Sequence, residues 1–217
     1  MQTAIRTLLG AALGAGCGHG ALLWAHRMLQ ARGREQRLSS AAAGFLVIAA
    51  AICGGIIGFC AGGLLPMASA LALLTIGIAV SVSDGLCRII PNPTVLAVFA
   101  AALLLMAATL LHLPGAPTFG VLSSLGGMVF CFLIFSAPGL MGKRVGAGDI
   151  KLAAAMGFLL GFDNALLAIA VMGVLIVGYS MIQRKMPLLA FLKTDIPMGP
   201  FIAAGMMIAW ILPYFPL

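Results

Sequence analysis

Acidic residues are scarce in this chain, and two of them stand in positions that suit catalysis. The 217 residues contain five carboxylates: Glu35, Asp84, Asp149, Asp163 and Asp195. Asp84 lies in "SVSDGLCRIIPNP" at the end of an apolar run, and Asp149 lies in "KRVGAGDIKL" at the start of another. Two carboxyl groups held close together share a proton. The ionised group can then take a proton from water while the protonated group polarises a carbonyl, which hydrolyses a peptide bond without a metal.

Structural roles are the alternative for each of these carboxylates. The alternative role of Asp149 is that of a helix N-cap. The alternative role of Asp84 is that of an interfacial residue ahead of a glycine break. Asp163 in the "GFDN" turn and Asp195 in a basic loop are predicted to be turn or cap residues. Glu35 is predicted to be solvated among arginines.

Histidine and cysteine predict no metal site. The five cysteines include no C-x-x-C pair, and most lie in apolar runs, where a free thiol packs as a small hydrophobe. The three histidines form no metal-ligand spacing and no Ser/His/Asp set. No cofactor is therefore expected.

The composition requires a membrane to position any site. Hydrophobic residues make up 63% of the chain and charged residues 8%, with a mean hydropathy of +1.18. Soluble domains have roughly 45–50% apolar and about 25% charged residues. The sequence predicts an all-α, polytopic transmembrane bundle, one domain over 1–217 without a soluble domain. The net charge of +7 lies in short loops and indicates topology, not nucleic-acid binding.

Eight apolar segments are predicted, separated by turn or charge chemistry such as "LLPM", "HLPGAP" and "GFDN". If all eight cross with the N-terminus outside, eleven of the twelve basic residues fall on the cytoplasmic side, and the opposite orientation inverts this count. Both termini are therefore expected to be external. The segments are Thr7–His26, Ala41–Leu65, Met67–Ser83, Thr94–Leu113, Thr118–Met141, Ile150–Phe162, Asn164–Gln183 and Pro197–Pro213.

This topology places Asp84 and Asp149 at the same cytoplasmic face. The segment Ile150–Phe162 reaches only about 20 Å at 1.5 Å per residue, against a hydrocarbon thickness of about 30 Å. It must therefore be recessed, which draws Asp149 below the surface. The negative end of one helix dipole meets Asp84 and the positive end of another meets Asp149, which favours Asp149 as the base, although water access could reverse this.

Three motifs resemble those of the type IV prepilin peptidases, membrane aspartic proteases of the G-x-G-D type. "GAGD", ending at Asp149, resembles the G-x-G-D motif, and "SDGLCRIIPN" resembles the family's first aspartate motif. "IPMGPFIAAG" resembles its Pro-x-Gly-Pro stretch. The resemblance covers a core of about 71–205. It agrees with eight helices, an external N-terminus and a cytoplasmic active site.

The resemblance implies an aspartic endopeptidase of the cell inner membrane that cleaves the basic leader of prepilin or pseudopilin substrates at the cytoplasmic face. Asp84 and Asp149 would be the catalytic pair. Membrane lipid and the substrate would be its partners, without nucleic acid. The supporting residues would be Gly146 and Gly148, which allow close approach of backbone, with Lys151, and the helix-disrupting Pro197, Gly199 and Pro200.

One departure from the family concerns the loop Arg27–Ser40, which contains no cysteine where bifunctional members have paired C-x-x-C motifs. Methyltransferase activity is therefore not supported. The chain looks like a compact, peptidase-only form, for which a Flp/Tad pilus system is one candidate. The competing class is a small proton- or cation-coupled transporter using Asp84 and Asp149, which predicts mid-membrane carboxylates and inverted repeats. A non-enzymatic assembly subunit is the third.

Overall fold

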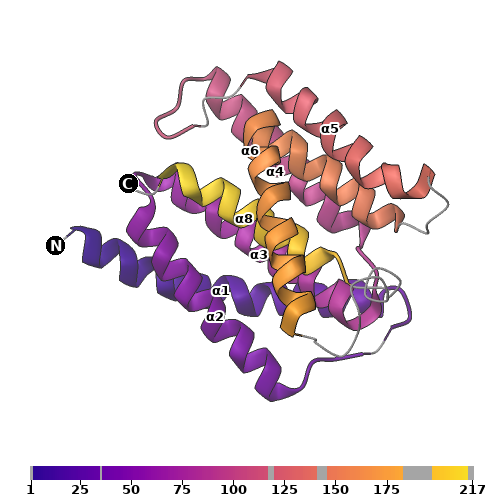
Figure 1. The fold of residues 1–217 in the computed structure, drawn as a ribbon. Coiled ribbons are helices and arrows are strands. Elements are labelled where there is room, and N and C mark those ends of the chain that lie inside the picture. The colour runs from indigo at the N-terminus through magenta and orange to yellow at the C-terminus, as the bar shows by residue number, and fades with distance from the viewer. Residues whose placement is uncertain (1, 35, 117–119, 141–145, 183–196, 215–217) are drawn as a thin grey trace.

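The computed structural model describes residues 2–34, 36–116, 120–140, 146–182 and 197–214, and helices dominate these ranges (Figure 1). Six of the helices are long and apolar enough to cross a membrane, and α8 is a shorter apolar helix. The predicted polytopic helical bundle is thus confirmed. The elements are α1 (Gln2–Gln30), α2 (Ser40–Cys60), α3 (Leu64–Cys87), α4 (Asn92–Leu110), α5 (Val121–Leu140), α6 (Ala147–Ile182), α8 (Gly199–Ile211) and the 3-10 turn η1 (Leu212–Tyr214).

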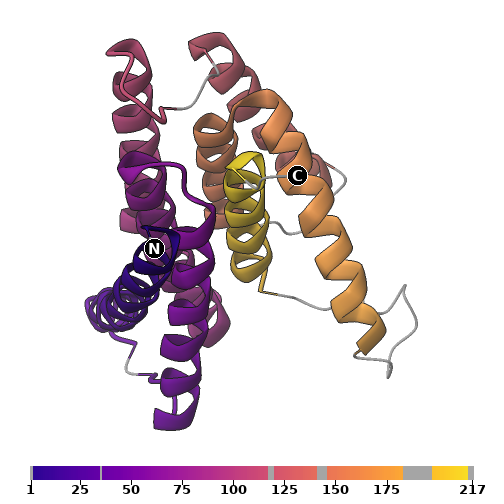
Figure 2. The same cartoon turned by 90° about the vertical axis from the view of Figure 1, so that its left-hand side faces the viewer.

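The long helix α6 contains a sharp bend at Gly161. This residue has φ 73° and ψ 174°, a backbone conformation that glycine adopts without strain. The two halves correspond to the predicted segments Ile150–Phe162 and Asn164–Gln183, and they meet at Gly161, the first residue of the predicted "GFDN" turn. Figure 2 shows the two halves diverging from this bend. With α6 divided here and α8 included, the described residues form eight helical segments.

The break between the second and third segments was predicted one turn too late. The helix α2 ends at Cys60 and α3 begins at Leu64, so Pro66 lies in the first turn of α3 and not between two helices. Proline fits this position because the first helical N–H groups have no intrahelical acceptor.

Glycines allow close helix packing in two places, as their four-residue spacing predicts. On α1 and α2, a Cβ on Gly14 would lie 2.9 Å from Gly54 Cα, so these backbones are in direct contact. On α5 and α6, a Cβ on Gly157 would lie 2.6 Å from the carbonyl carbon of Gly127. Both helix pairs therefore depend on residues without side chains.

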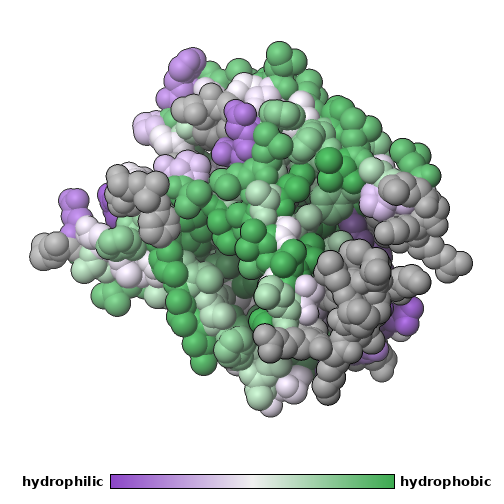
Figure 3. Space-filling view, viewed as in Figure 1, coloured by the Kyte–Doolittle hydropathy of each residue, from purple (hydrophilic) through white to green (hydrophobic). Residues whose placement is uncertain are grey.

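The outer surface carries large apolar side chains, as a lipid-facing surface should. Phe45 on α2, Leu104 on α4 and Val174 on α6 are each more than 70% exposed. Apolar residues cover much of the face drawn in Figure 3, with hydrophilic residues mostly near its margins. The packed interior centres on α3, which contacts α1, α4 and α8.

The ends of the helices divide the bundle into two sides. The start of α1 and the end of α8 lie on one side, near the labels N and C in Figure 1. The end of α3 and the starts of α6 and α8 lie on the other. Both motif aspartates are therefore at the side remote from the termini.

Candidate active site

Asp84 lies in the last turn of α3 and is only 5% exposed. The helix ends three residues later because Arg88 adopts a left-handed conformation, with φ 52° and ψ 41°. The Arg88 N–H donates to the Asp84 carbonyl at 2.8 Å, which closes the last turn. Pro91 then caps the start of α4, so the "RIIPN" stretch is a short connection that fixes the end of α3.

Asp149 lies in the first turn of α6, where its N–H donates to the Gly146 carbonyl at 3.0 Å. The side chain is half-buried. A Cβ on Gly146 would lie 2.5 Å from Asp149 Oδ2, so a side chain at this position would push the carboxylate away. The first glycine of the "GAGD" motif therefore leaves room for the carboxylate that follows it.

The second glycine of that motif brings the two aspartates together. A Cβ on Gly148 would lie 3.0 Å from Ile90 Cβ, so the start of α6 packs against the connection that follows α3. The two carboxyl groups are close enough that the charge on Asp84 acts on Asp149. Asp84 and Asp149 therefore lie at the same end of the bundle.

A third motif completes the surroundings of Asp84. The backbone N–H of Gly199 donates to Asp84 Oδ2 at 2.7 Å, and this hydrogen bond is buried. A Cβ on Gly199 would lie 2.8 Å from Asp84 Cβ and 3.0 Å from Val80 Cγ1. Only glycine lets the start of α8 approach α3 this closely.

The Pro-x-Gly-Pro stretch, whose residues Pro197, Gly199 and Pro200 were expected to disrupt helical structure, lies at the start of a helix. Gly199 and Pro200 form the first turn of α8, and the Gly199 N–H is occupied by Asp84. The half-buried Pro197 lies just before this turn.

The start of α8 also changes the argument on which aspartate is the base. The sequence-based preference for Asp149 rests on the dipoles of α3 and α6 alone. The N-terminus of α8 faces Asp84, and both its dipole and the Gly199 N–H stabilise negative charge on that carboxylate. The charge of Arg88 acts on Asp84 as well. The helix-direction preference for Asp149 as the base was therefore incomplete.

Lys151 and the remaining acidic residues occupy different positions along the chain. The side chain of Lys151 is exposed on α6, one turn or less from Asp149. Asp163 is exposed just beyond the bend at Gly161, at the far end of the first half of α6. Glu35 and Asp195 fall outside the described residues. Among the residues that the structure does describe, no three His, Cys, Asp or Glu side chains are grouped to hold a metal ion.

Sequence reasoning did not identify two of the residues that shape the site. Ile90 receives Gly148, and Val80 lies one turn before Asp84 against Gly199. Ile90 was part of a quoted motif but carried no assigned role. Val80 had no sequence signal, because it is one of many aliphatic residues in the apolar run of α3.

The fold and the site define a helical membrane protein in which two interacting carboxylates lie at helix ends on one side of the bundle. The chain belongs to the type IV leader peptidase family, whose family model matches residues 70–181. The matched range begins close to the predicted core boundary at 71 and ends before the "IPMGP" stretch. Comparisons with curated proteins and with solved structures give no significant match.

Proposed function

We propose that this protein is an aspartic endopeptidase that removes the leader of type IV prepilin-like proteins at the cytoplasmic face of the inner membrane. Membership of the type IV leader peptidase family supports a peptidase of this kind. Asp84 and Asp149 are the proposed catalytic pair. The substrate is a prepilin or pseudopilin held in the lipid bilayer.

The observation that carries the proposal is the meeting of the two motif aspartates. They are 65 positions apart in the sequence. The contact of Gly148 with Ile90 nevertheless joins their motifs, and the charge on one carboxyl acts on the other. Two close carboxyls do not both ionise readily and share one proton.

The proposed reaction follows from that shared proton. The ionised carboxyl takes a proton from a water molecule, and the resulting hydroxide attacks the scissile carbonyl carbon. The protonated carboxyl donates to the carbonyl oxygen, which stabilises the charge that develops there. Proton return to the leaving amine completes the cleavage, and no covalent intermediate forms. The Gly199 N–H holds Asp84 Oδ2, which fixes one of the two carboxyls while these protons move.

The transporter alternative fits the arrangement less well. Proton- or cation-carrying carboxylates in transporters lie near the bilayer midplane, in broken helices of repeated halves. Asp84 is instead in the last turn of α3, and Asp149 is in the first turn of α6. Two carboxylates at helix ends suit a substrate that reaches the membrane surface.

Coexpression with candidate type IV prepilins in a host without its own leader peptidase tests the proposal. We expect loss of the leader, seen as a shorter pilin with a new N-terminus, only when the enzyme is present. Prepilins that stay intact beside correctly inserted enzyme would contradict it. A non-enzymatic assembly subunit would also leave the prepilins intact. It further predicts that substitutions at either aspartate leave the protein's function unchanged.

A further inference from the structure

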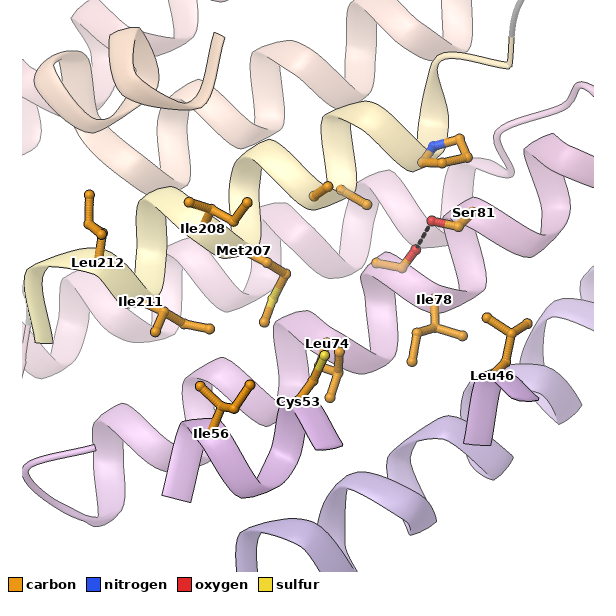
Figure 4. A pocket seen from close by; sticks show the side chains of 14 residues that line it. Leu46, Cys53, Ile56, Leu74, Ile78, Ser81, Met207, Ile208, Ile211 and Leu212 are labelled. Carbon is orange, nitrogen blue, oxygen red and sulfur yellow. Dashed lines mark hydrogen bonds between the residues drawn. The ribbon is translucent and has the colours of Figure 1, made fainter. Parts of the chain in front are cut away.

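A groove of about 550 Å³ lies between α2, α3 and α8 (Figure 4). Small residues line it where α3 and α8 pack together: a Cβ on Gly77 would lie 3.4 Å from Ala203 Cβ. Long apolar side chains from the facing helices extend along it, including Ile56 on α2 and Ile208 on α8. Met207 adds an unbranched, adaptable side chain.

The lining of the groove suits hydrocarbon and not a polar ligand. Ser81 is the one hydroxyl-bearing side chain among the described lining residues, and its hydroxyl donates to the Gly77 carbonyl at 2.7 Å. Figure 4 shows this bond within the turn of α3, so it offers no free donor to the groove. A charged or polar molecule would lose its hydration here without gaining partners.

One end of the groove lies next to the candidate active site. Pro200 lines it and directly follows Gly199, whose N–H binds Asp84. Leu74, which also lines it, precedes Asp84 by ten positions on the same helix, or about 15 Å at 1.5 Å per residue. The groove therefore extends from the first turn of α8, next to the residue that binds Asp84, to about the middle of a hydrocarbon layer that is about 30 Å thick.

We propose that this groove binds the apolar helix of the membrane-embedded substrate, on the C-terminal side of the bond that is cut. The proposal rests on the proposed function above. Backbone in hydrocarbon must satisfy its own hydrogen bonds, so a substrate segment at this depth is helical. The groove then takes one face of that helix, in the manner of an amphipathic helix docked through anchors at i, i+3, i+4 and i+7.

Two features distinguish this occupant from a lipid acyl chain. Small residues along the contact of α3 and α8 let a second backbone approach closely, which an acyl chain does not require. The groove also ends beside Asp84, where the polypeptide of a substrate must enter for its bond to be cut. A substrate helix in the groove would thus place its membrane-surface end at the two aspartates.

Cysteine cross-linking tests the proposal with a native residue of the groove. Cys53 on α2 lines the groove, whereas its neighbour Ile52 is 60% exposed and does not line it. One enzyme keeps Cys53 and carries alanine at the other four cysteines. Its matched control has C53A and I52C in that background. The probe is a type IV prepilin in lipid vesicles with a single cysteine about ten residues after its cleavage site.

We expect oxidation to join prepilin to Cys53 at least about tenfold more than to a cysteine at position 52, because the two side chains point about 100° apart on α2. Equal yields, no cross-link at Cys53, or a Cys53–Cys53 dimer in place of the mixed product would each overturn the groove assignment. Leader cleavage by wild-type enzyme is scored in the same vesicles. Its failure contradicts the proposed function, whereas cleavage without the Cys53 cross-link contradicts only the groove.

A filling substitution gives a second readout that needs no cysteine change. Ala204 lines the groove, and Ala100 is exposed on α4 away from it. In otherwise wild-type enzyme, A204F should slow cleavage of membrane-embedded prepilin at least about tenfold by occupying part of the groove. A100F, which adds the same side chain at the lipid surface, should cleave at the wild-type rate. Equal rates for the two variants would overturn the proposal.

Discussion

The backbone N–H of Gly199 donates a hydrogen bond to Asp84 Oδ2 at 2.7 Å, across 115 positions of sequence. This bond places the start of α8 directly against the end of α3. It explains why a glycine is needed at the third motif, since any side chain there would meet Asp84 and Val80. Two close contacts thus hold the three motifs together: Gly199 with Asp84, and Gly148 with Ile90.

Asp84→Asn and Asp149→Asn should each reduce leader cleavage by at least about a hundredfold, because an amide can neither take nor share the proton that the pair requires. Membrane insertion should be unchanged. Processing of coexpressed prepilin, measured beside the level of inserted enzyme, checks this. Normal processing by either variant would show that the reaction does not use both carboxyls.

Gly199→Ala should slow cleavage about tenfold or more while the protein still folds. The added Cβ would lie 2.8 Å from Asp84 Cβ, so the carboxylate must shift from the Gly199 N–H. The matched control is Gly178→Ala on α6, where an added Cβ has nothing within 4 Å. The measurement compares the cleavage rates of the two purified variants at equal stability. A Gly199→Ala enzyme as fast as Gly178→Ala would show that this hydrogen bond has no part in positioning Asp84.

Asp163→Asn and Asp195→Asn should both retain cleavage at about the wild-type rate. Asp163 is exposed beyond the bend of α6, and the first half of that helix separates it from Asp149. Asp195 matches no catalytic motif and stands two positions before Pro197 in the sequence. The same coexpression assay measures both variants. Inactive but well-folded Asp163→Asn protein would contradict the site and the topology together.

Both termini should lie outside the cytoplasm. The start of α1 and the end of α8 lie on one side of the bundle and the two aspartates on the other (Figure 1). Eleven of twelve basic residues are cytoplasmic in this orientation. A C-terminal reporter that is active only in the cytoplasm should therefore stay silent, while a reporter that needs export should be active. A strong cytoplasmic signal would contradict the eight-segment crossing.

Cleavage should persist when zinc is chelated, because a pair of carboxyls activates water without a Lewis acid. The enzyme should also fail to methylate its product, since the loop Arg27–Ser40 has no cysteine. Chelation and zinc re-addition test the first part, and labelled S-adenosylmethionine tests the second. Activity that depends on added zinc would refute the metal-free mechanism. Label on the new N-terminus would show that the missing cysteines do not report on methylation.

The sequence determined most of the helical architecture and the two motifs that contain Asp84 and Asp149. Hydropathy is summed over adjacent residues, so eight apolar segments could be predicted from local composition. The motifs around Asp84 and Asp149 were visible for the same reason, as each is a short run of neighbours. The break between the sixth and seventh segments was predicted in "GFDN". The structure places it at the first residue of that stretch, Gly161, because the backbone there needs a residue that tolerates φ 73°.

Only the tertiary structure decided how these segments meet. Gly199 and Asp84 are joined by a hydrogen bond that no local pattern encodes, and Val80 entered the site solely because α8 packs against α3. The groove between α2, α3 and α8 likewise depends on three segments that are distant in sequence. Through-space contacts of this kind follow from how whole helices pack, and apolar runs of similar composition are compatible with many packings. In the observed packing, glycines lie at the points where the helices approach each other most closely.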